Sequence, residues 1–159
     1  MLNVLPGIQP DHCIRAFVEA GAIRLAHPPA EGQIQPASLD LRLGEKAYRV
    51  RASFLPGPDR TVRRRLDDLA LHEIDLTRGA VLETGCVYIA ELMEGLKLPA
   101  GLRAAANPKS STGRLDVFTR IITDCARESD LVEDGYEGPL FIEISPRTFP
   151  VLVRSGSRL

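Results

Sequence analysis

The chain has 159 residues, of which 44% are hydrophobic and 26% charged, so it is long enough for one buried core and predicts a single domain over residues 1–159. The 20 lysines and arginines nearly balance the 21 aspartates and glutamates, which leaves a net charge of −1 and excludes a surface built to cover a nucleic-acid backbone. No apolar run approaches the roughly 18 residues that a membrane span needs, and the three cysteines are too scattered for a disulfide framework. We therefore expect a cytoplasmic protein with neither a nucleic-acid nor a membrane partner.

The first predicted element is a short helix that begins near Asp11 and stops near Gly21. Its apolar residues recur at helical spacing, at Ile14, Phe17 and Val18. We expect these three side chains to face the core.

From Gln33 onward the pattern changes to that of strands. Residues 38–44 alternate leucines with polar residues, which predicts a half-buried strand ended by Gly44. Residues 47–55 alternate again, and 56–60 have the composition of a turn.

The segment 61–74 predicts a second short helix. Its inward residues are expected to be Val62, Leu66, Leu69 and Leu71. The three consecutive arginines at 63–65 are typical of a solvated face, and we assign them no function.

The rest of the chain consists of short apolar segments separated by glycines and prolines. They cover 79–92, 95–108, 114–123, 138–145 and 149–159. Several short strands at close spacing favour a β-sandwich or barrel over alternating strands and helices. The expected fold is therefore mostly β with a short N-terminal helix.

One candidate functional segment is 107–114, with the sequence NPKSSTGR. Lys109 and Arg114 bracket three hydroxyl side chains and a glycine, a combination that suits a phosphate chain. The residue order is not that of a Walker loop. A polar loop with a capping serine remains an equally good interpretation.

A second candidate is Glu143. In a strand with a period of two it shares one face with Phe141 and Ser145. Acids at such positions usually face water, and this is the favoured prediction. The alternative is a pocket beside Phe141, in which Glu143 could act as a general base and acid.

Asp40 is a third acid of interest, because it lies within an apolar alternation. We expect it to be a structural partner for an arginine such as Arg42 or Arg114.

Metal and nucleophile motifs are missing from the sequence. His12, His27 and His72 do not have the spacing of a zincin or a zinc deaminase. A serine hydrolase would need a G-x-S-x-G turn, which the chain lacks. The neighbours His12 and Cys13 are expected to be helix surface and helix core.

Three segments, 35–44, 107–118 and 134–145, have residues and an order that resemble the dCTP deaminase and dUTPase superfamily. The similarity is greatest to 2′-deoxycytidine 5′-triphosphate (dCTP) deaminases, in particular to a longer bacterial form. This resemblance implies a distorted β-barrel or jelly-roll subunit of the dUTPase-like type. It also implies a homotrimer with active sites between subunits.

The resemblance implies roles for individual residues. Glu143 corresponds to the catalytic glutamate, Ser110 would hold the catalytic water, and Arg114 would stabilise charge near Glu143. The implied nucleotide-binding set is Lys109, Ser110, Ser111, Thr112, Gly113, Arg114, Asp130, Phe141 and Ile142.

At Phe141 and Ile142 the backbone is expected to bind the pyrimidine. The acid that contacts the sugar is one of Asp130, Glu133 and Asp134, and we select Asp130.

The implied reaction is the hydrolytic deamination of dCTP to dUTP and ammonia, in dUTP and dTTP synthesis. One glutamate that accepts and returns a proton can serve it. No protein-bound zinc is implied, and Mg²⁺ arrives on the triphosphate. Because the chain ends at Leu159, we expect it to lack the family's C-terminal strand, its tail and the second half of the longer form.

Three other hypotheses stay open. A dUTPase would cleave dUTP to dUMP and pyrophosphate with an aspartate near the start of the segment 134–145. A bifunctional enzyme would do both steps. The third hypothesis is a non-catalytic nucleotide-binding or trimerisation half. Glu143 separates deaminase from dUTPase, because only the deaminase needs an acid there.

Overall fold

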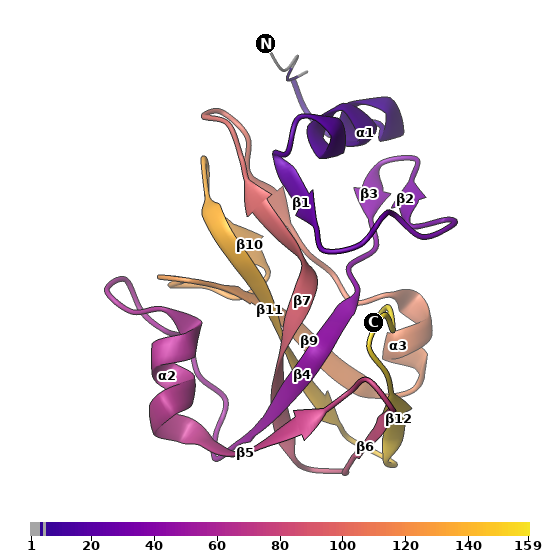
Figure 1. The fold of residues 1–159 in the computed structure, drawn as a ribbon. Helices are drawn as coiled ribbons and strands as arrows, with labels where there is room; N and C mark the ends of the chain where they lie inside the picture. The colour runs from indigo at the N-terminus through magenta and orange to yellow at the C-terminus, as the bar shows by residue number, and fades with distance from the viewer. Residues whose placement is uncertain (1–3, 5) are drawn as a thin grey trace.

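A six-stranded antiparallel sheet forms the centre of the computed structural model, which describes residue 4 and residues 6–159 (Figure 1). Five strands follow one another in the order β5-β4-β7-β11-β9. The sixth strand, β1, pairs with the C-terminal end of β7. The bounds are β1 (Ile23–Leu25), β4 (Leu43–Val50), β5 (Ala70–Asp75), β7 (Val87–Lys97), β9 (Val117–Thr123) and β11 (Glu137–Pro146). β11 therefore lies between two long neighbours.

Three small strand pairs and three helices surround this sheet in the described part of the chain. The pairs are β2 (Ile34–Gln35) with β3 (Ser38–Leu39), β6 (Ala80–Leu82) with β12 (Val151–Val153), and β8 (Ala104–Ala105) with β10 (Leu131–Val132). The helices are α1 (Asp11–Glu19), α2 (Val62–Leu69) and α3 (Ser110–Arg114). The predicted mostly-β fold is confirmed, although β5 and β9 do not pair to close a barrel within residues 4 and 6–159.

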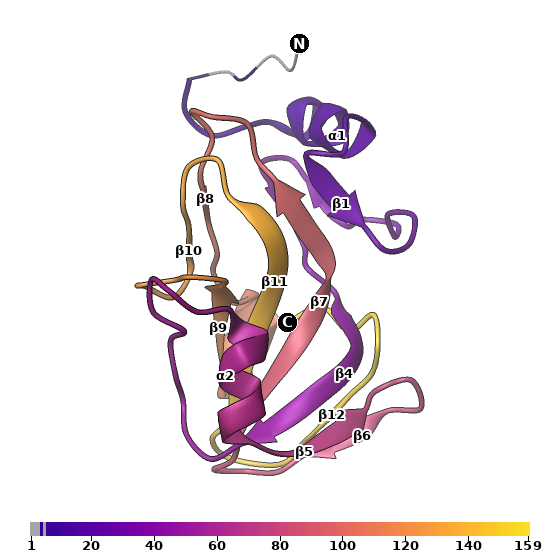
Figure 2. The same ribbon diagram turned by 60° about the vertical axis from the view of Figure 1, so that its left-hand side comes forward.

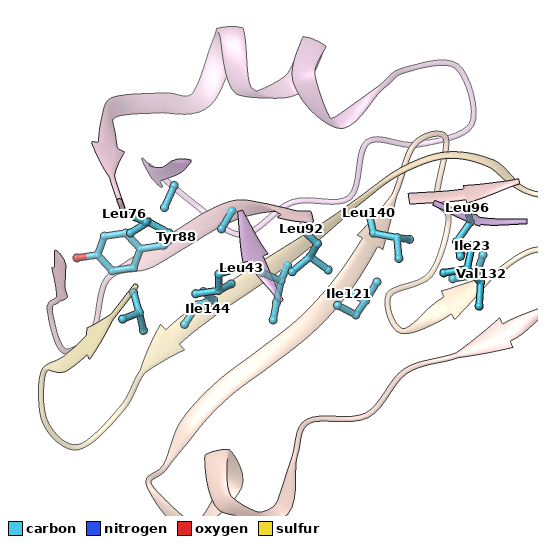
Figure 3. Close-up of a cluster of buried hydrophobic side chains, with 14 of the residues drawn as sticks. Ile23, Leu43, Leu76, Tyr88, Leu92, Leu96, Ile121, Val132, Leu140 and Ile144 are labelled. Carbon is cyan, nitrogen blue, oxygen red and sulfur yellow. The ribbon is translucent and has the colours of Figure 1, made fainter. Parts of the chain in front are cut away.

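The sheet has a core on each face. The larger cluster gathers side chains such as Leu43, Leu92 and Ile144 (Figure 3). The smaller cluster lies under α2, which stands in front of β9 and β11 in Figure 2, and consists of Val50, Phe54, Val62, Leu66, Ile89, Ile122, Ala126 and Phe141. Because both faces are covered, every residue of β11 from 140 to 146 is buried.

The first predicted helix is confirmed as α1. Cys13, Ile14 and Phe17 are buried and Val18 is half-buried. Just after the helix, Gly21 adopts a positive φ of 73°, which a glycine does without strain.

The predicted strand over 38–44 is wrong in its extent. Its leucine alternation breaks at Arg42, which is buried, and β4 begins only at Leu43. Gly44 does not end a strand but lies inside β4. A Cβ there would come within 2.7 Å of the Glu91 carbonyl oxygen, so this glycine permits close strand packing.

The second predicted helix is shorter than the pattern indicated. Thr61 caps it by accepting a hydrogen bond from the Arg64 N–H, and it ends at Leu69. The chain then becomes β5, which leaves Leu71 50% exposed. The inward prediction for Leu71 is wrong because strand periodicity replaces helical periodicity at residue 70.

The segment before β4 is fixed by a buried polar network. Arg42 donates from Nε to one Glu94 oxygen at 2.8 Å and from its backbone N–H to the other at 2.7 Å. Gln33 adds a hydrogen bond to Glu94, and the Arg42 guanidinium also donates to the carbonyls of His27 and Pro28. These contacts attach the N-terminal loop to β7.

Candidate functional site

Glu143 lies at the middle of β11 and is 2% exposed. The favoured prediction that it faces water is wrong, because β11 is an interior strand with both of its faces covered. Its side chain points to the same face as Phe141, which belongs to the smaller core cluster. Arg120 of β9 lies directly opposite Glu143 in the strand register.

Two side chains hold the Glu143 carboxylate. Arg120 donates from Nη2 to Oε1 at 2.7 Å, and the Ser53 hydroxyl donates to Oε2 at 2.7 Å. The same Arg120 nitrogen also donates to the Ser53 oxygen at 2.5 Å. We call Ser53, Arg120 and Glu143 the carboxylate clamp.

Glu143 is the one member of this clamp that the sequence predicted. A charged residue within the apolar run 117–123 was the available signal for Arg120. Ser53 follows β4 on an irregular segment, and no local pattern marks it. Its place is fixed by the neighbouring Phe54, which is buried in the smaller core cluster.

The surroundings of the clamp have unused hydrogen-bonding capacity. Arg120 Nε and Ser145 Oγ are buried and have no protein partner among the described residues. Ser145 lies opposite Phe118 in the register, and the Arg120 guanidinium carbon lies 5.2 Å from the centre of the Phe118 ring. Unpaired polar atoms therefore gather beside Glu143.

A cavity of about 500 Å³ adjoins the clamp through Arg120. It brings together two residues of the predicted nucleotide-binding set, Gly113 and Asp130. Its full lining is Pro108, Gly113, Asp116, Val117, Phe118, Thr119, Arg120, Asp130 and Arg147. The cavity thus connects the candidate loop with the start of β9.

The candidate loop 107–114 ends in the short helix α3. Ser110, Ser111 and Arg114 are exposed, whereas Thr112 is buried. The alternative of a capping serine is wrong, because the residue at the N-terminal cap is Lys109 and no side chain caps the helix. The exposed hydroxyls and the guanidinium are therefore free of a capping role.

Asp40 has a structural partner, but not an arginine from the predicted pair. Lys109 donates to its carboxylate at 2.5 Å, and Arg158 lies 3.5 Å from it. Arg42 pairs with Glu94 instead. The Asp40–Lys109 ion pair joins the first two of the three family-like segments.

The three acids considered for sugar contact have different environments. Asp130 lines the cavity, and its Oδ1 accepts a hydrogen bond from the Ile121 N–H at 2.7 Å. Asp134 instead accepts from the Gly101 N–H with both oxygens. Glu133 is exposed. The cavity position is consistent with selecting Asp130, whose role remains a prediction.

Phe141 and Ile142 have buried side chains in opposite core clusters. Their strand pairs with β7 on one side and β9 on the other. Their backbone groups lie in these ladders, so any bond from them to a pyrimidine would use remaining carbonyl lone pairs. That role also remains a prediction.

Within the described residues, no hydrogen bond or ion pair connects Glu143 with Ser110, Ser111 or Arg114. The predicted acid and the predicted loop are thus two separate groups within one subunit. Both groups lie next to β9, because α3 packs against that strand and Glu143 lies opposite Arg120 of β9.

Tyr136 connects the two strands that carry the clamp. Its hydroxyl donates to the Pro139 carbonyl of β11 and accepts from the Asp124 N–H just after β9. Burial raises the pKa of Tyr136 to about 12. A Cβ on Gly138 would lie 2.5 Å from this hydroxyl, which explains the glycine two residues after the tyrosine.

The described residues contain no group of three or more His, Cys, Asp or Glu side chains that could hold a metal ion. His12 is exposed and Cys13 buried, as the sequence predicted. No helix in the part of the chain that the structure covers is long and apolar enough to cross a membrane.

Residues 5–159 match the family described as the 2′-deoxycytidine 5′-triphosphate deaminase N-terminal domain. A crystal structure of 2′-deoxycytidine 5′-triphosphate deaminase from Agrobacterium tumefaciens is 61% identical, with a TM-score of 0.94 over 96% of this chain. The match covers 46% of that structure's chain, so the present chain spans about half its length.

Two curated relatives are more distant. A dUMP-forming dCTP deaminase of a Parafrankia species is 31% identical over 94% of this chain and 71% of its own. A dCTP deaminase of Haemophilus influenzae is 28% identical over 84% of this chain and 69% of its own.

Proposed function

Because the chain belongs to the 2′-deoxycytidine 5′-triphosphate deaminase N-terminal domain family, we propose that it deaminates dCTP. The products are dUTP and ammonia. The observation that carries this proposal is Glu143, a carboxylate on an interior strand that is 2% exposed yet hydrogen-bonded through both oxygens. A dUTPase has no need for an acid at this position.

The proposed reaction is a hydrolysis that uses no zinc. Glu143 takes a proton from water as the water oxygen attacks C4 of cytosine, and it delivers a proton to the ring nitrogen. Glu143 then carries the second water proton from the new C4 hydroxyl to the amino group, and the C4–N bond breaks as the C4 carbonyl forms and ammonia leaves. Ser110 holds the water and Arg114 stabilises the developing charge.

The arrangement of these residues favours an active site between subunits. Within the described residues of one subunit, Glu143 shares no hydrogen bond or ion pair with the exposed Ser110 and Arg114, whereas the mechanism needs them around one cytosine. We propose that the loop 107–114 of one copy meets Glu143 of another in a homotrimer.

The triphosphate binds to the same loop. Ser111, Thr112 and Gly113 supply donors and close backbone approach, and Lys109 supplies charge beside its partner Asp40. Mg²⁺ enters on the nucleotide and neutralises part of the phosphate charge. We also place the reaction in the cytoplasm, where precursors for DNA synthesis are made.

Incubation of the purified chain with dCTP and Mg²⁺, followed by anion-exchange chromatography, tests the proposal. We expect dUTP and ammonia from the wild type and about 1000-fold slower formation of both from Glu143→Gln. If the folded wild type binds dCTP without any product, the deaminase proposal is wrong and the chain is a non-catalytic nucleotide-binding half.

One observation favours a second candidate, the bifunctional enzyme. The Parafrankia relative is named as dUMP-forming. In the same assay a bifunctional enzyme yields dUMP and pyrophosphate. Added dUTP would then also be consumed, whereas a deaminase alone leaves it intact.

A further inference from the structure

The carboxylate clamp contains two residues that the family-like segments did not include, Ser53 and Arg120. We propose that both are positioning residues for deamination: they hold the Glu143 carboxylate in the one orientation in which it can exchange protons with water and cytosine. This inference rests on the proposed function.

The hydrogen bonds fix the orientation of every group in the clamp. Arg120 Nη2 donates to both Ser53 and Glu143. Because the Ser53 oxygen accepts from Arg120, its own proton is directed to Glu143 Oε2 at 2.7 Å. Rotation of the carboxylate would break a bond to each of its oxygens.

The clamp is placed where an acid could still react. Ser53 is exposed and the Arg120 side chain is 32% exposed, whereas Glu143 itself is 2% exposed. The Glu143 side chain is therefore buried beneath two partners that themselves reach the molecular surface. A carboxylate has about four acceptor sites, so the two hydrogen bonds leave others free for water or substrate.

The polar atoms beside the clamp argue against a purely structural ion pair. Arg120 Nε and Ser145 Oγ are buried without a protein partner among the described residues. Structural networks normally satisfy such groups, and unsatisfied ones need another explanation. A donor and a hydroxyl next to Glu143 are well suited to hold a water molecule for the reaction.

The test compares kcat and KM for dCTP in four variants of the chain. Ser53→Ala removes one hydrogen bond, and we expect kcat to fall about tenfold with KM unchanged, because a misplaced reacting group lowers rate rather than binding. Ser53→Thr keeps the hydroxyl and should recover most of the rate. Arg120→Lys keeps the charge but not the guanidinium geometry, and should lose about tenfold or more in kcat.

Arg24→Met provides the matched control. Arg24 of β1 forms an ion pair at 2.6 Å with Glu137, which lies on β11 as Glu143 does, and both side chains are about half exposed. The loss of Arg24 should therefore leave kcat unchanged. Thermal melts confirm that each variant is folded at the assay temperature.

The outcomes separate the two proposals. If the wild type makes dUTP but Ser53→Ala retains its kcat, or Ser53→Thr is as slow as Ser53→Ala, the positioning role is wrong and the deaminase stands. If the folded wild type makes no dUTP, the proposed function fails and this inference fails with it.

Discussion

Two buried glutamates on neighbouring strands of the central sheet pair with arginines, Glu94 of β7 with Arg42 and Glu143 of β11 with Arg120. Their distances are nearly equal, 2.8 Å and 2.7 Å. Their surroundings differ. The Arg42 side chain is 7% exposed and the Arg120 side chain 32% exposed.

We call the Glu94–Arg42 pair the closed pair, because protein groups accept from all of its guanidinium nitrogens, and the Glu143–Arg120 pair the open pair, because one guanidinium nitrogen has no such partner among the described residues. Glu94 accepts three hydrogen bonds, and both terminal nitrogens of the Arg42 guanidinium donate to loop carbonyls. Glu143 accepts two, and the Nε atom of its arginine has no protein partner in the described residues. The same two residue types therefore hold a loop in place in the closed pair, whereas in the open pair they leave a hydrogen-bond donor, Arg120 Nε, without a protein partner among the described residues.

The largest expected effect on activity comes from the open pair. Glu143→Gln should lower kcat about 1000-fold, the middle of the range for a general acid–base group, while the protein remains folded and binds dCTP. Glu137→Gln on the same strand is the control, because that side chain is half exposed. Turnover near the wild-type rate in Glu143→Gln would exclude this residue as the proton carrier.

The closed pair should instead determine stability. Arg42→Met leaves the Glu94 carboxylate buried without its cation, and we expect a loss of about 3–5 kcal/mol in the free energy of unfolding. Urea titration measures this loss. Activity per folded molecule should not change, and a variant as stable as the wild type would contradict the structural role.

Arg114 tests whether the loop meets the open pair from another subunit. Arg114→Ala removes a charged donor, so affinity for dCTP and kcat should each fall about 10-fold to 100-fold, as for hydrogen bonds to charged groups. Binding is measured by calorimetry. Mixing Arg114→Ala with Glu143→Gln subunits should restore some turnover, because a mixed trimer contains one site with both wild-type residues.

The sequence predicted the strands and helices where the period was clear, as in α1 and β11. It failed where tertiary contacts override periodicity. Arg42 is buried within a leucine alternation because Glu94, 52 residues away, pairs with it. No local pattern contains that partner.

The candidate site was predictable to the same extent. Glu143 and the loop 107–114 were found from residue types and from their order along the chain. Ser53 was not, because its role depends on a 90-residue separation from Glu143. The solvated prediction for Glu143 failed because strand alternation cannot show whether a second face is covered, here by α2.

The smallest expected effect concerns Tyr136, which connects the strands of the open pair. Burial raises its pKa to about 12, whereas an unfolded tyrosine titrates near pH 10. Between these values the unfolded chain loses the proton first, so the stability that Tyr136 contributes is present below about pH 10 and is lost as the pH rises toward 12. The melting temperature of Tyr136→Phe should therefore fall less steeply than that of the wild type over this interval.

Near pH 8 the variant should be about 1 kcal/mol less stable than the wild type, because it lacks the hydroxyl that bonds to Pro139 and Asp124. Equal slopes in both proteins would mean that this hydroxyl is not buried between the two strands.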